Sequence, residues 1–370
     1  MALLVDFIND IPGYWGILPL LVIFPLPLEC MRAVIADRLR MLRALNFPRI
    51  FNAMLVWLGY YWSKWGPRPQ HFGMPVAIAV EPTTACNLGC PECPSGLRSF
   101  SRPTGNLKIE LLQTLLEETR KTTAYVTFYF QGEPFIHPGI FEMIRIASAK
   151  GMYTATSTNA HFLDSERARE VVLSGLSRLI ISIDGTTQEV YEHYRKGGEL
   201  DKVLKGTAEV IAWKKRLGSA TPHIIFQFLV VKPNQHQIPE VKRLAKNMGV
   251  DELRFKTAQV YDFENGNHLI PDIPRYSRYK QNNQGTWEIK NALDNHCWKM
   301  WHSCVITQNG EVVPCCFDKN ASKSLGNIAS HGLKVVWQGE KYRAFRAAIL
   351  RSRKEIDICR NCSEGTRVWA

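Results

Sequence analysis

From residue 76 onward, short apolar runs rich in β-branched side chains alternate with longer segments in which apolar residues recur at helical spacing. The short runs predict strands at residues 76–80, 126–130, 153–157, 179–183, 224–231 and 252–255. The longer segments predict helices at residues 109–119, 140–149, 165–173 and 238–247, and another that ends near residue 217. Strands that alternate with helices of about ten or more residues indicate βαβ units and a parallel sheet. Six such repeats, without a seventh and an eighth, predict an α/β fold with a partial (β/α)6 TIM-like barrel.

The first 75 residues follow a different pattern. Residues 11–28 form an uncharged run near the length that spans a bilayer, but its four prolines argue against a continuous transmembrane helix. In residues 31–45 apolar side chains follow one helical face and arginines another, and residues 50–62 form a second apolar segment. Two interpretations are open: amphipathic helices at a membrane interface, or a helical cap on the main domain or on a second subunit. Residues 66–69 are a plausible linker.

The chain has 370 residues, of which 45% are apolar and 22% charged, so most of it can bury a core. Length and pattern predict an N-terminal apolar helical extension at residues 1–75, the barrel at 76–290 and a small C-terminal hairpin and helix domain at 291–370. The formal net charge is +12, but no long basic run and no helix-turn-helix or zinc-finger spacing favours nucleic acid as a partner. An anionic membrane surface or an anionic substrate explains the charge equally well. A signal peptide fits the N-terminus poorly, so we expect a cytoplasmic protein, with peripheral attachment to the inner face of the membrane as the alternative.

Nine of the ten cysteines are clustered, which indicates metal binding before disulfides. Cys86, Cys90 and Cys93 lie in the turn-rich loop after the first predicted strand. Three thiolates this close in sequence can hold three irons of a cubane cluster and leave the fourth iron without a protein ligand. An open position is typical of a catalytic metal centre. A structural zinc ion would need a fourth ligand nearby, and His71 and His137 are not at zinc-finger spacing.

The loop and the motifs that follow it resemble the radical SAM superfamily, whose signature is Cys-x3-Cys-x2-Cys after the first barrel strand. Residues 131–134, Gln-Gly-Glu-Pro, resemble the family's Gly-Gly-Glu-Pro motif. The resemblance implies these cofactor-binding residues: Gly132, Glu133, Ser157, Asn159, Ser182, Asp184 and Arg195. Arg195 matches an arginine that pairs with the carboxylate of S-adenosyl-L-methionine (SAM), a task that suits a planar guanidinium. Two positions depart from the family pattern, because Glu92 stands where an aromatic residue is usual and Gln131 replaces the first glycine.

This resemblance implies an enzyme with a 4Fe–4S cluster that binds SAM at its open iron. Electrons from a donor such as flavodoxin or ferredoxin would drive SAM cleavage, and the 5′-deoxyadenosyl radical so formed would take a hydrogen atom from the substrate. The cofactor supplies the difficult chemistry, and the protein supplies position and exclusion of water.

Six further cysteines follow residue 296: Cys297, Cys304, Cys315, Cys316, Cys359 and Cys362. Asn309 and Gly310 mark a hairpin turn that would bring the two ends of this stretch together, and the Cys-x2-Cys pair at its end can close a shared metal site. The stretch resembles the SPASM/Twitch extension of radical SAM enzymes, in the one-cluster Twitch arrangement. The resemblance implies an auxiliary 4Fe–4S cluster bound by Cys297, Cys315, Cys359 and Cys362, with Cys316 or Cys304 as alternative ligands. Zinc is the alternative metal, because four thiolates suit its tetrahedral preference.

A second cluster with four thiolate ligands has no open site, so we expect it to accept or relay an electron. Asp318 is the candidate general base for the proton that leaves with that electron, and a turn-forming role at the end of the hairpin is the alternative for this residue. We therefore expect a radical SAM enzyme, acting near the membrane on a small molecule, a sugar or a lipid-linked substrate. The alternatives are a radical SAM peptide maturase and, from another class, a non-catalytic zinc or iron–sulfur scaffold.

Overall fold

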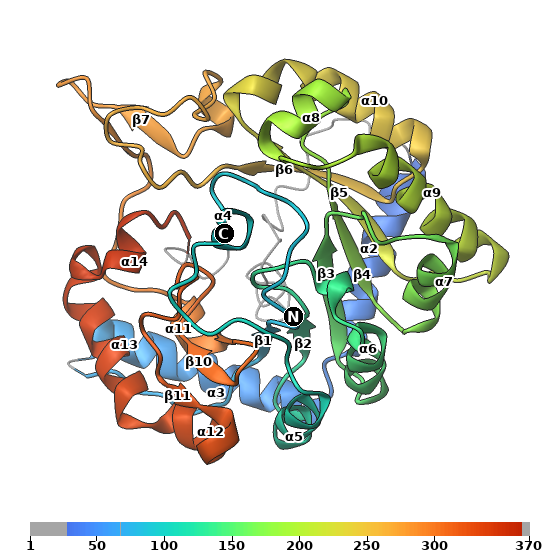
Figure 1. The fold of residues 1–370 in the computed structure, drawn as a ribbon. Coiled ribbons are helices and arrows are strands. Elements are labelled where there is room, and N and C mark those ends of the chain that lie inside the picture. The colour runs from blue at the N-terminus through green and yellow to red at the C-terminus, as the bar shows by residue number, and fades with distance from the viewer. Residues whose placement is uncertain (1–27, 67, 365–370) are drawn as a thin grey trace.

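Six parallel strands form the centre of the computed structural model, which describes residues 28–66 and 68–364. The strands are β1 (Ala77–Val80), β2 (Tyr125–Thr127), β3 (Tyr153–Thr158), β4 (Arg178–Ser182), β5 (His223–Val230) and β6 (Glu252–Thr257). They lie side by side in chain order and curve around the centre of the molecule (Figure 1). Each starts within one residue of the position expected from the sequence, and the prediction of a partial barrel is confirmed.

Helices connect the strands and cover the outer face of the sheet (Figure 1). They are α5 (Ile109–Thr119), α6 (Ile140–Ala149), α7 (Ser165–Leu173), α8 (Gln188–Tyr194), α9 (Leu200–Arg216) and α10 (Ile238–Met248). Their apolar faces are fully buried, as at Leu116, Met143 and Val171, and pack on outward-facing strand residues such as Val126. This burial leaves the carboxyl ends of the strands and the loops after them to carry polar groups.

The C-terminal region extends the barrel sheet. Strands β9 (Ser303–Ile306), β10 (Glu311–Val313) and β11 (Gly326–Asn327) continue the sheet beyond β1, so that the described residues form one sheet in the order β11-β10-β9-β1-β2-β3-β4-β5-β6. Strand β9 is parallel to β1, with Ser303 opposite Ala77. The predicted hairpin connects β9 to β10, and its turn residue Gly310 has the positive φ of 85° that favours glycine. The loops after β1 and β9 therefore meet at the same edge of the sheet.

The remaining C-terminal elements are short. They comprise the hairpin β7 (Tyr279–Gln281) and β8 (Trp287–Ile289), and the helices α11 (Lys299–His302), α12 (Ile328–Gln338), α13 (Glu340–Ser352) and α14 (Asp357–Arg360). Trp337 of α12 is fully buried and donates a hydrogen bond of 3.0 Å to the carbonyl of Gly73. Arg346 of α13 lies over the Trp337 ring and donates to the carbonyl of Met300 at 3.0 Å. These contacts join α12 to the segment that precedes β1, and α13 to α11 and α12.

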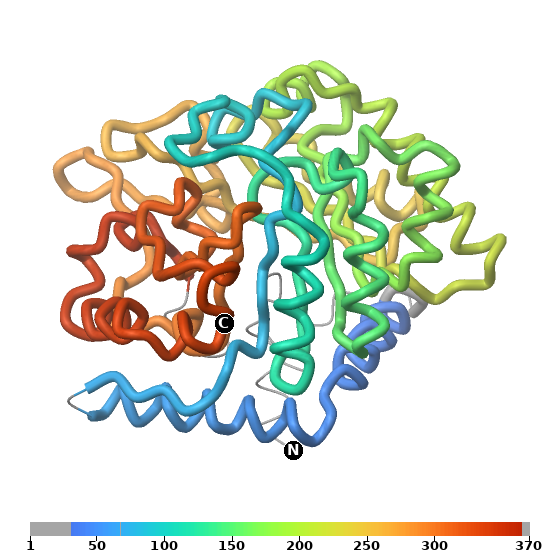
Figure 2. The backbone as a smooth tube through the Cα atoms, turned by 60° about the horizontal axis from the view of Figure 1, so that its bottom comes forward, coloured from blue at the N-terminus to red at the C-terminus, as the bar shows by residue number. Residues whose placement is uncertain are grey.

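Two helices, α2 (Leu28–Arg43) and α3 (Phe47–Trp65), cover the amino ends of the strands. Asp37 of α2 forms an ion pair with Arg178, the first residue of β4, and accepts a hydrogen bond of 2.5 Å from Tyr153, the first residue of β3. Arg49 of α3 is buried and donates to the carbonyls of Arg120 and of three other residues. The two helices thus form a cap on the barrel (Figure 2).

The uncharged run at residues 11–28 lies outside the described residues, apart from Leu28 at the start of α2. Within residues 28–66 and 68–364, no helix has both the length and the apolar character needed to cross a bilayer.

Candidate active site

The three clustered cysteines lie in the loop that leaves the carboxyl end of β1, as expected. Cys93 caps the short helix α4 (Pro94–Leu97), and its backbone N–H donates to the carbonyl of Cys90 at 3.3 Å. Cys90 is buried, and Cys86 and Cys93 are partly exposed. Burial raises the pKa of the Cys86 thiol to about 11, and the charges of Glu133, Cys90 and Cys93 act in the same direction. The three thiols therefore lie near one another, in a site where a bound cation would favour the thiolate form.

Gly132 places the end of β2 against this loop. Its φ is +75°, and a Cβ atom at this position would lie 2.2 Å from the carbonyl oxygen of Thr83. Its N–H donates to Ser95 Oγ at 2.8 Å. The preceding Gln131, which departs from the family pattern, places its Oε1 at 3.6 Å from Cys93 Sγ. Only glycine allows this close approach of backbone to backbone beside the thiols.

Glu133 is buried and accepts hydrogen bonds from residues at the end of β3. Its Oε1 accepts hydrogen bonds from Thr158 Oγ1 at 2.7 Å and Phe135 N at 3.2 Å, and its Oε2 accepts from Asn159 N at 2.7 Å. The Asn159 side chain in turn donates to Asn87 Oδ1 at 2.8 Å, next to Cys86 in the cysteine loop. Glu133 and Asn159 therefore connect the loops after β1, β2 and β3 into one polar structure.

Asp184 and Arg195 form a second connection to the loop. Asp184 is buried after β4, accepts from Leu229 N at 2.7 Å and lies 2.5 Å from Arg195 Nε. This pairing orients the guanidinium so that its Nη1 lies 3.8 Å from Cys90 Sγ. The arginine is thus fixed beside the thiols, where a carboxylate bound at an open iron would meet it.

The other two predicted cofactor-binding residues lie on neighbouring strands. Ser182 is the last residue of β4 and is buried. Ser157, in β3, is partly exposed. It lies on the same face of the strand as Tyr153 and Ala155, and these two residues pack against α2. Both hydroxyls belong to strands whose ends surround the cysteine loop.

The four predicted C-terminal ligands come together from three segments of the chain. Electrostatic interactions join Cys315 to Cys297 and Cys362, and join Cys359 to Cys297. Burial raises the pKa values of Cys359 and Cys362 to about 11 and about 12. Within residues 28–66 and 68–364, no three His, Cys, Asp or Glu side chains enclose a single metal ion.

An arginine also accompanies this second group of thiols. Arg353 is buried, and its Nη2 lies 3.2 Å from Cys362 Sγ and 2.6 Å from the carbonyl of Glu364. Of the two remaining cysteines, Cys316 also interacts electrostatically with Cys315, so it stays an alternative ligand. The thiol of Cys304 lies near Arg346, and the exposed Cys316 interacts with the ion pair of Lys299 and Glu364. By number and type of donor, Cys297, Cys315, Cys359 and Cys362 offer the four thiols of a closed iron–sulfur site, and the loop offers the three thiols of an open one.

Asp318 is buried after β10, where both of its oxygens hold the loop that follows. Oδ1 accepts from the backbone N–H and the hydroxyl of Ser322 at 2.8 Å, and Oδ2 accepts from Lys323 N at 2.9 Å. These contacts match the turn-forming alternative, and the role of general base stays a prediction.

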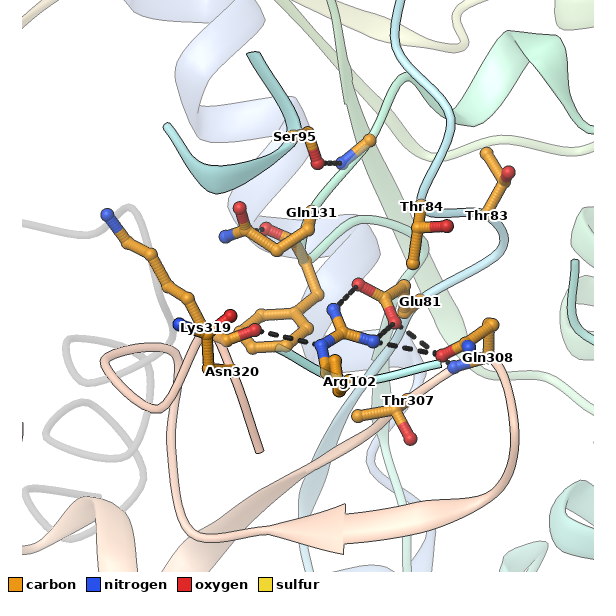
Figure 3. Close-up of polar contacts among 12 residues, drawn as sticks. Glu81, Thr83, Thr84, Ser95, Arg102, Gln131, Thr307, Gln308, Lys319 and Asn320 are labelled. Atoms are coloured by element: carbon orange, nitrogen blue, oxygen red, sulfur yellow. Dashed lines mark hydrogen bonds and ion pairs between the residues drawn. The ribbon is translucent and has the colours of Figure 1, made fainter. Parts of the chain in front are cut away.

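A buried network joins the two cysteine regions, and the sequence reasoning missed it (Figure 3). Glu81, the residue after β1, receives two hydrogen bonds from Arg102, at 2.5 and 2.8 Å. Arg102 also donates to Gln308 Oε1 at 3.0 Å and to the carbonyl of Lys319 at 2.9 Å, both in the C-terminal region. Glu81 could have been identified from the sequence, because it is an acidic residue at the carboxyl end of a predicted barrel strand. No sequence pattern marks Arg102.

Comparisons with known proteins agree with this geometry. Residues 80–212 match the radical SAM superfamily, and residues 297–363 match the SPASM iron–sulfur cluster-binding domain. The first match covers the cysteine loop and Arg195, and the second begins at Cys297 and includes Cys362.

Similar proteins of named function align along most of the chain. The tungsten-containing aldehyde ferredoxin oxidoreductase cofactor-modifying protein of Pyrococcus furiosus is 26% identical over 73% of this chain and 82% of its own. The PqqA peptide cyclase of Bradyrhizobium diazoefficiens is 23% identical over 75% of this chain and 77% of its own. Among solved structures, Streptococcus suis SuiB bound to S-adenosylmethionine has a TM-score of 0.59 at 14% identity, over 91% of this chain and 84% of its own. The fold is therefore shared with SuiB at low sequence identity.

Proposed function

The chain belongs to the radical SAM superfamily and carries a SPASM iron–sulfur domain, and on this premise we propose that it modifies a peptide by hydrogen-atom abstraction. Membership of these families implies a 4Fe–4S cluster that binds SAM, and auxiliary iron–sulfur binding in the C-terminal domain. When bound, these groups supply a carbon-centred radical and an electron-transfer centre.

The residues of the first site have separate tasks in this proposal. Cys86, Cys90 and Cys93 would hold three irons and leave one iron free for SAM. The Arg195 guanidinium would bind the SAM carboxylate, and Asp184 orients this guanidinium through the contact at 2.5 Å. The backbone at Gly132, which Ser95 holds in place, would bind the SAM amino group.

The polar structure around Glu133 keeps this arrangement rigid. Its carboxylate has hydrogen bonds to three groups at the ends of β2 and β3, so it acts as a positioning residue. Ser157, Asn159 and Ser182 provide polar groups at the neighbouring strand ends, where we place the ribose and adenine of SAM. Such pre-organised polar groups reduce the reorganisation needed during the reaction.

The C-terminal site supplies the second redox centre. Cys297, Cys315, Cys359 and Cys362 would bind an auxiliary cluster through all four positions, and such a cluster transfers electrons without binding substrate directly. The network of Glu81, Arg102 and Gln308 bonds the residue after β1 to the C-terminal region, which supports a constant separation of the two sites.

The relationship with the PqqA peptide cyclase carries the choice of a peptide as substrate. It extends over 75% of this chain and 77% of that protein. A small-molecule or lipid-linked substrate is the other candidate. The similarity to the cofactor-modifying protein of Pyrococcus furiosus supports this candidate.

The test uses the holoenzyme purified without oxygen, with SAM, a reductant and extract of cells grown in deuterated medium. We expect deuterium to enter 5′-deoxyadenosine from the peptide fraction of the extract, and treatment of that fraction with a protease to abolish the transfer. Transfer only from the low-mass, protease-resistant fraction would contradict a peptide substrate. Iron and sulfide in the protein, together with SAM cleavage under reducing conditions, test the enzyme class separately.

A further inference from the structure

Helix α3 exposes a line of large apolar side chains, although Val56 and Tyr60 on its other side are buried in the core. The exposed side chains follow one stripe of the helix: Phe47, Phe51, Met54, Leu58, Trp62 and Trp65. Trp62 is 63% exposed and Trp65 is 79% exposed. The opposite side buries Val56, Gly59 and Tyr60 together with three polar residues. These are Arg49, Asn52 and Ser63, and all three make hydrogen bonds to backbone carbonyls. A surface helix of a soluble domain normally has a polar outer side, so this exposed apolar stripe indicates an apolar partner.

The stripe continues onto α2 and onto the segment after α3. Met31, Ile35 and Leu39, four residues apart, are about half exposed, while Asp37, Met41 and Ala44 of the same helix are buried. Phe72 is 43% exposed, and its ring packs against Trp62 with the centroids 6.4 Å apart. Figure 2 shows α2 and α3 following one another along the same end of the molecule. We name these ten side chains, three on α2, six on α3 and Phe72, the apolar face.

The exposed charges that residues 31–66 and 68–75 themselves carry are all basic, and the exposed carboxylate of Asp294 lies 3.6 Å from His296, the hydrogen-bond partner of Tyr60. The exposed cations within residues 31–66 and 68–75 are Arg32, Arg43, Lys64 and Arg68. The acidic side chain of this part, Asp37, is buried against Arg178. A partner for this surface therefore has to be apolar in its interior and negatively charged where it meets the arginines and lysine.

We propose that the apolar face docks on the surface of a bilayer that contains anionic lipids. The Phe, Leu and Met side chains enter the boundary between headgroups and acyl chains, and the two tryptophans occupy the interfacial region that suits their amphipathic rings. The cations meet lipid phosphates at the same depth. The helices lie on the membrane and do not cross it, because their inner sides are bonded to the barrel.

Docking in this orientation points the reaction site away from the bilayer. Helix α2 packs against Ala77, Tyr125 and Tyr153, which are the first residues of β1, β2 and β3. The cysteine loop leaves the opposite, carboxyl end of β1. The substrate then reaches the radical site from the aqueous side, as a peptide would, while the enzyme stays at the membrane.

The test compares two leucines of nearly equal exposure in the full-length holoenzyme. Leu58 is 45% exposed on the apolar face, and Leu173, at the end of α7, is 46% exposed elsewhere. Wild-type protein is expected to float with phosphatidylcholine vesicles that contain phosphatidylglycerol, and to float less with phosphatidylcholine alone. Leu58→Glu should lower the vesicle partition coefficient by at least about tenfold, because burial of one leucine has this effect, while Leu173→Glu leaves it unchanged. Both variants should retain the SAM cleavage and the thermal unfolding of the wild type.

A second variant tests how much the basic side chains contribute to binding of anionic lipids. Lys64→Gln combined with Arg43→Gln should reduce binding to the phosphatidylglycerol vesicles and leave binding to phosphatidylcholine unchanged. Failure of the wild type to bind either vesicle would overturn the proposal. So would equal binding by Leu58→Glu and Leu173→Glu, which would place the contact in another segment such as residues 1–27. A dimer that Leu58→Glu dissociates, without vesicle binding, would assign the face to a second copy of the chain and equally overturn it.

Discussion

The two groups of cysteines can be compared directly, because each has buried thiols and an accompanying arginine. The first group occupies residues 86–93 of a single loop, and Arg195 lies 3.8 Å from Cys90 Sγ. The second group draws Cys297, Cys315, Cys359 and Cys362 from separate segments, and Arg353 lies 3.2 Å from Cys362 Sγ. A local loop offers three thiols, whereas a site assembled from separate segments can offer four. If these thiols bind the clusters as we propose, the first site has an open position and the second has none.

Removing one thiol from each group should separate the two roles most strongly. We expect Cys90→Ala to decrease the rate of 5′-deoxyadenosine formation by at least about a thousandfold, which equals roughly 4 kcal/mol of activation free energy. Cys362→Ala should leave that rate within about a factor of three and abolish the modified product, since it alters only the electron-transfer centre. Assays of 5′-deoxyadenosine and product, with electron paramagnetic resonance of both clusters, measure the two effects.

Cys304→Ala is the control for this pair, because Cys304 is buried but lies outside both groups. It should keep the full iron and sulfide content. Equal loss of SAM cleavage in Cys90→Ala and Cys362→Ala would show that the two sites do not have distinct roles.

The arginine of the first group should act on cofactor binding. Arg195→Lys keeps the charge but loses the two parallel donors, so we expect the Kd for SAM to rise by about tenfold to a hundredfold. Asp184→Asn should have a smaller effect in the same direction, because Asp184 acts through the orientation of Arg195. Equilibrium dialysis with SAM, at cluster contents matched by absorbance, measures the change. An unchanged Kd with a lowered kcat would contradict a carboxylate-binding role.

The ion pair between the two regions should contribute mainly to stability. Arg102→Ala leaves the buried carboxylate of Glu81 unpaired, and we expect a loss of about 3 kcal/mol, or a decrease of roughly 4 °C in Tm. Burial already raises the pKa of Glu81, and removal of Arg102 raises it further. An acid whose folded pKa exceeds its unfolded value is favoured below the unfolded pKa and penalised as pH rises through the folded pKa. The loss of folding stability in Arg102→Ala should therefore be largest at neutral pH and become smaller as the solution is acidified.

Arg120→Ala is the matched control for that substitution. Arg120 also pairs with a glutamate, Glu117, at 2.7 Å, but its side chain is 53% exposed. Exposed pairs contribute less than about 1 kcal/mol, so Tm should change by about 1 °C or less. Glu81→Gln added to Arg102→Ala should recover part of the lost stability. A defect independent of pH, or one equal to that of Arg120→Ala, would contradict the assigned role of the pair.

The local parts of this molecule could be predicted, and the long-range parts could not. The strands and most helices follow from periodicity within windows of ten or so residues, and Cys86, Cys90 and Cys93 follow from their spacing. The pairing of β9 with β1 joins residues more than two hundred positions apart, and no local pattern reports it. The same holds for Arg102, whose partners Glu81 and Gln308 become neighbours only in the folded chain.

Helix α3 shows a different limit of pattern reasoning. Its periodicity identifies two faces but does not say which one is buried. The usual rule would bury Phe51 and expose Asn52, and the structure has the opposite arrangement. Asn52 binds the carbonyls of Met74 and Thr122, and Val56 and Tyr60 of the same side enter the core, so these tertiary contacts determine the orientation of the helix. A helix with two plausible faces thus needs tertiary information before its exposed side can be assigned.

The arginine of the second group should have the smallest effect, and that effect should appear as a reduction potential. Arg353 donates toward Cys362 Sγ at 3.2 Å and is buried, so its charge favours the reduced, more negative form of a bound cluster. We expect Arg353→Gln to lower the potential of the auxiliary cluster by roughly 40 mV, equivalent to about 1 kcal/mol for one electron. Arg353→Lys keeps the charge and should shift this reduction potential less. Redox titration followed by electron paramagnetic resonance measures the potential in both variants. The cluster bound by Cys86, Cys90 and Cys93 should keep its potential in the same samples, and a shift of both clusters together would show that Arg353 acts on the fold instead of on its neighbouring thiol.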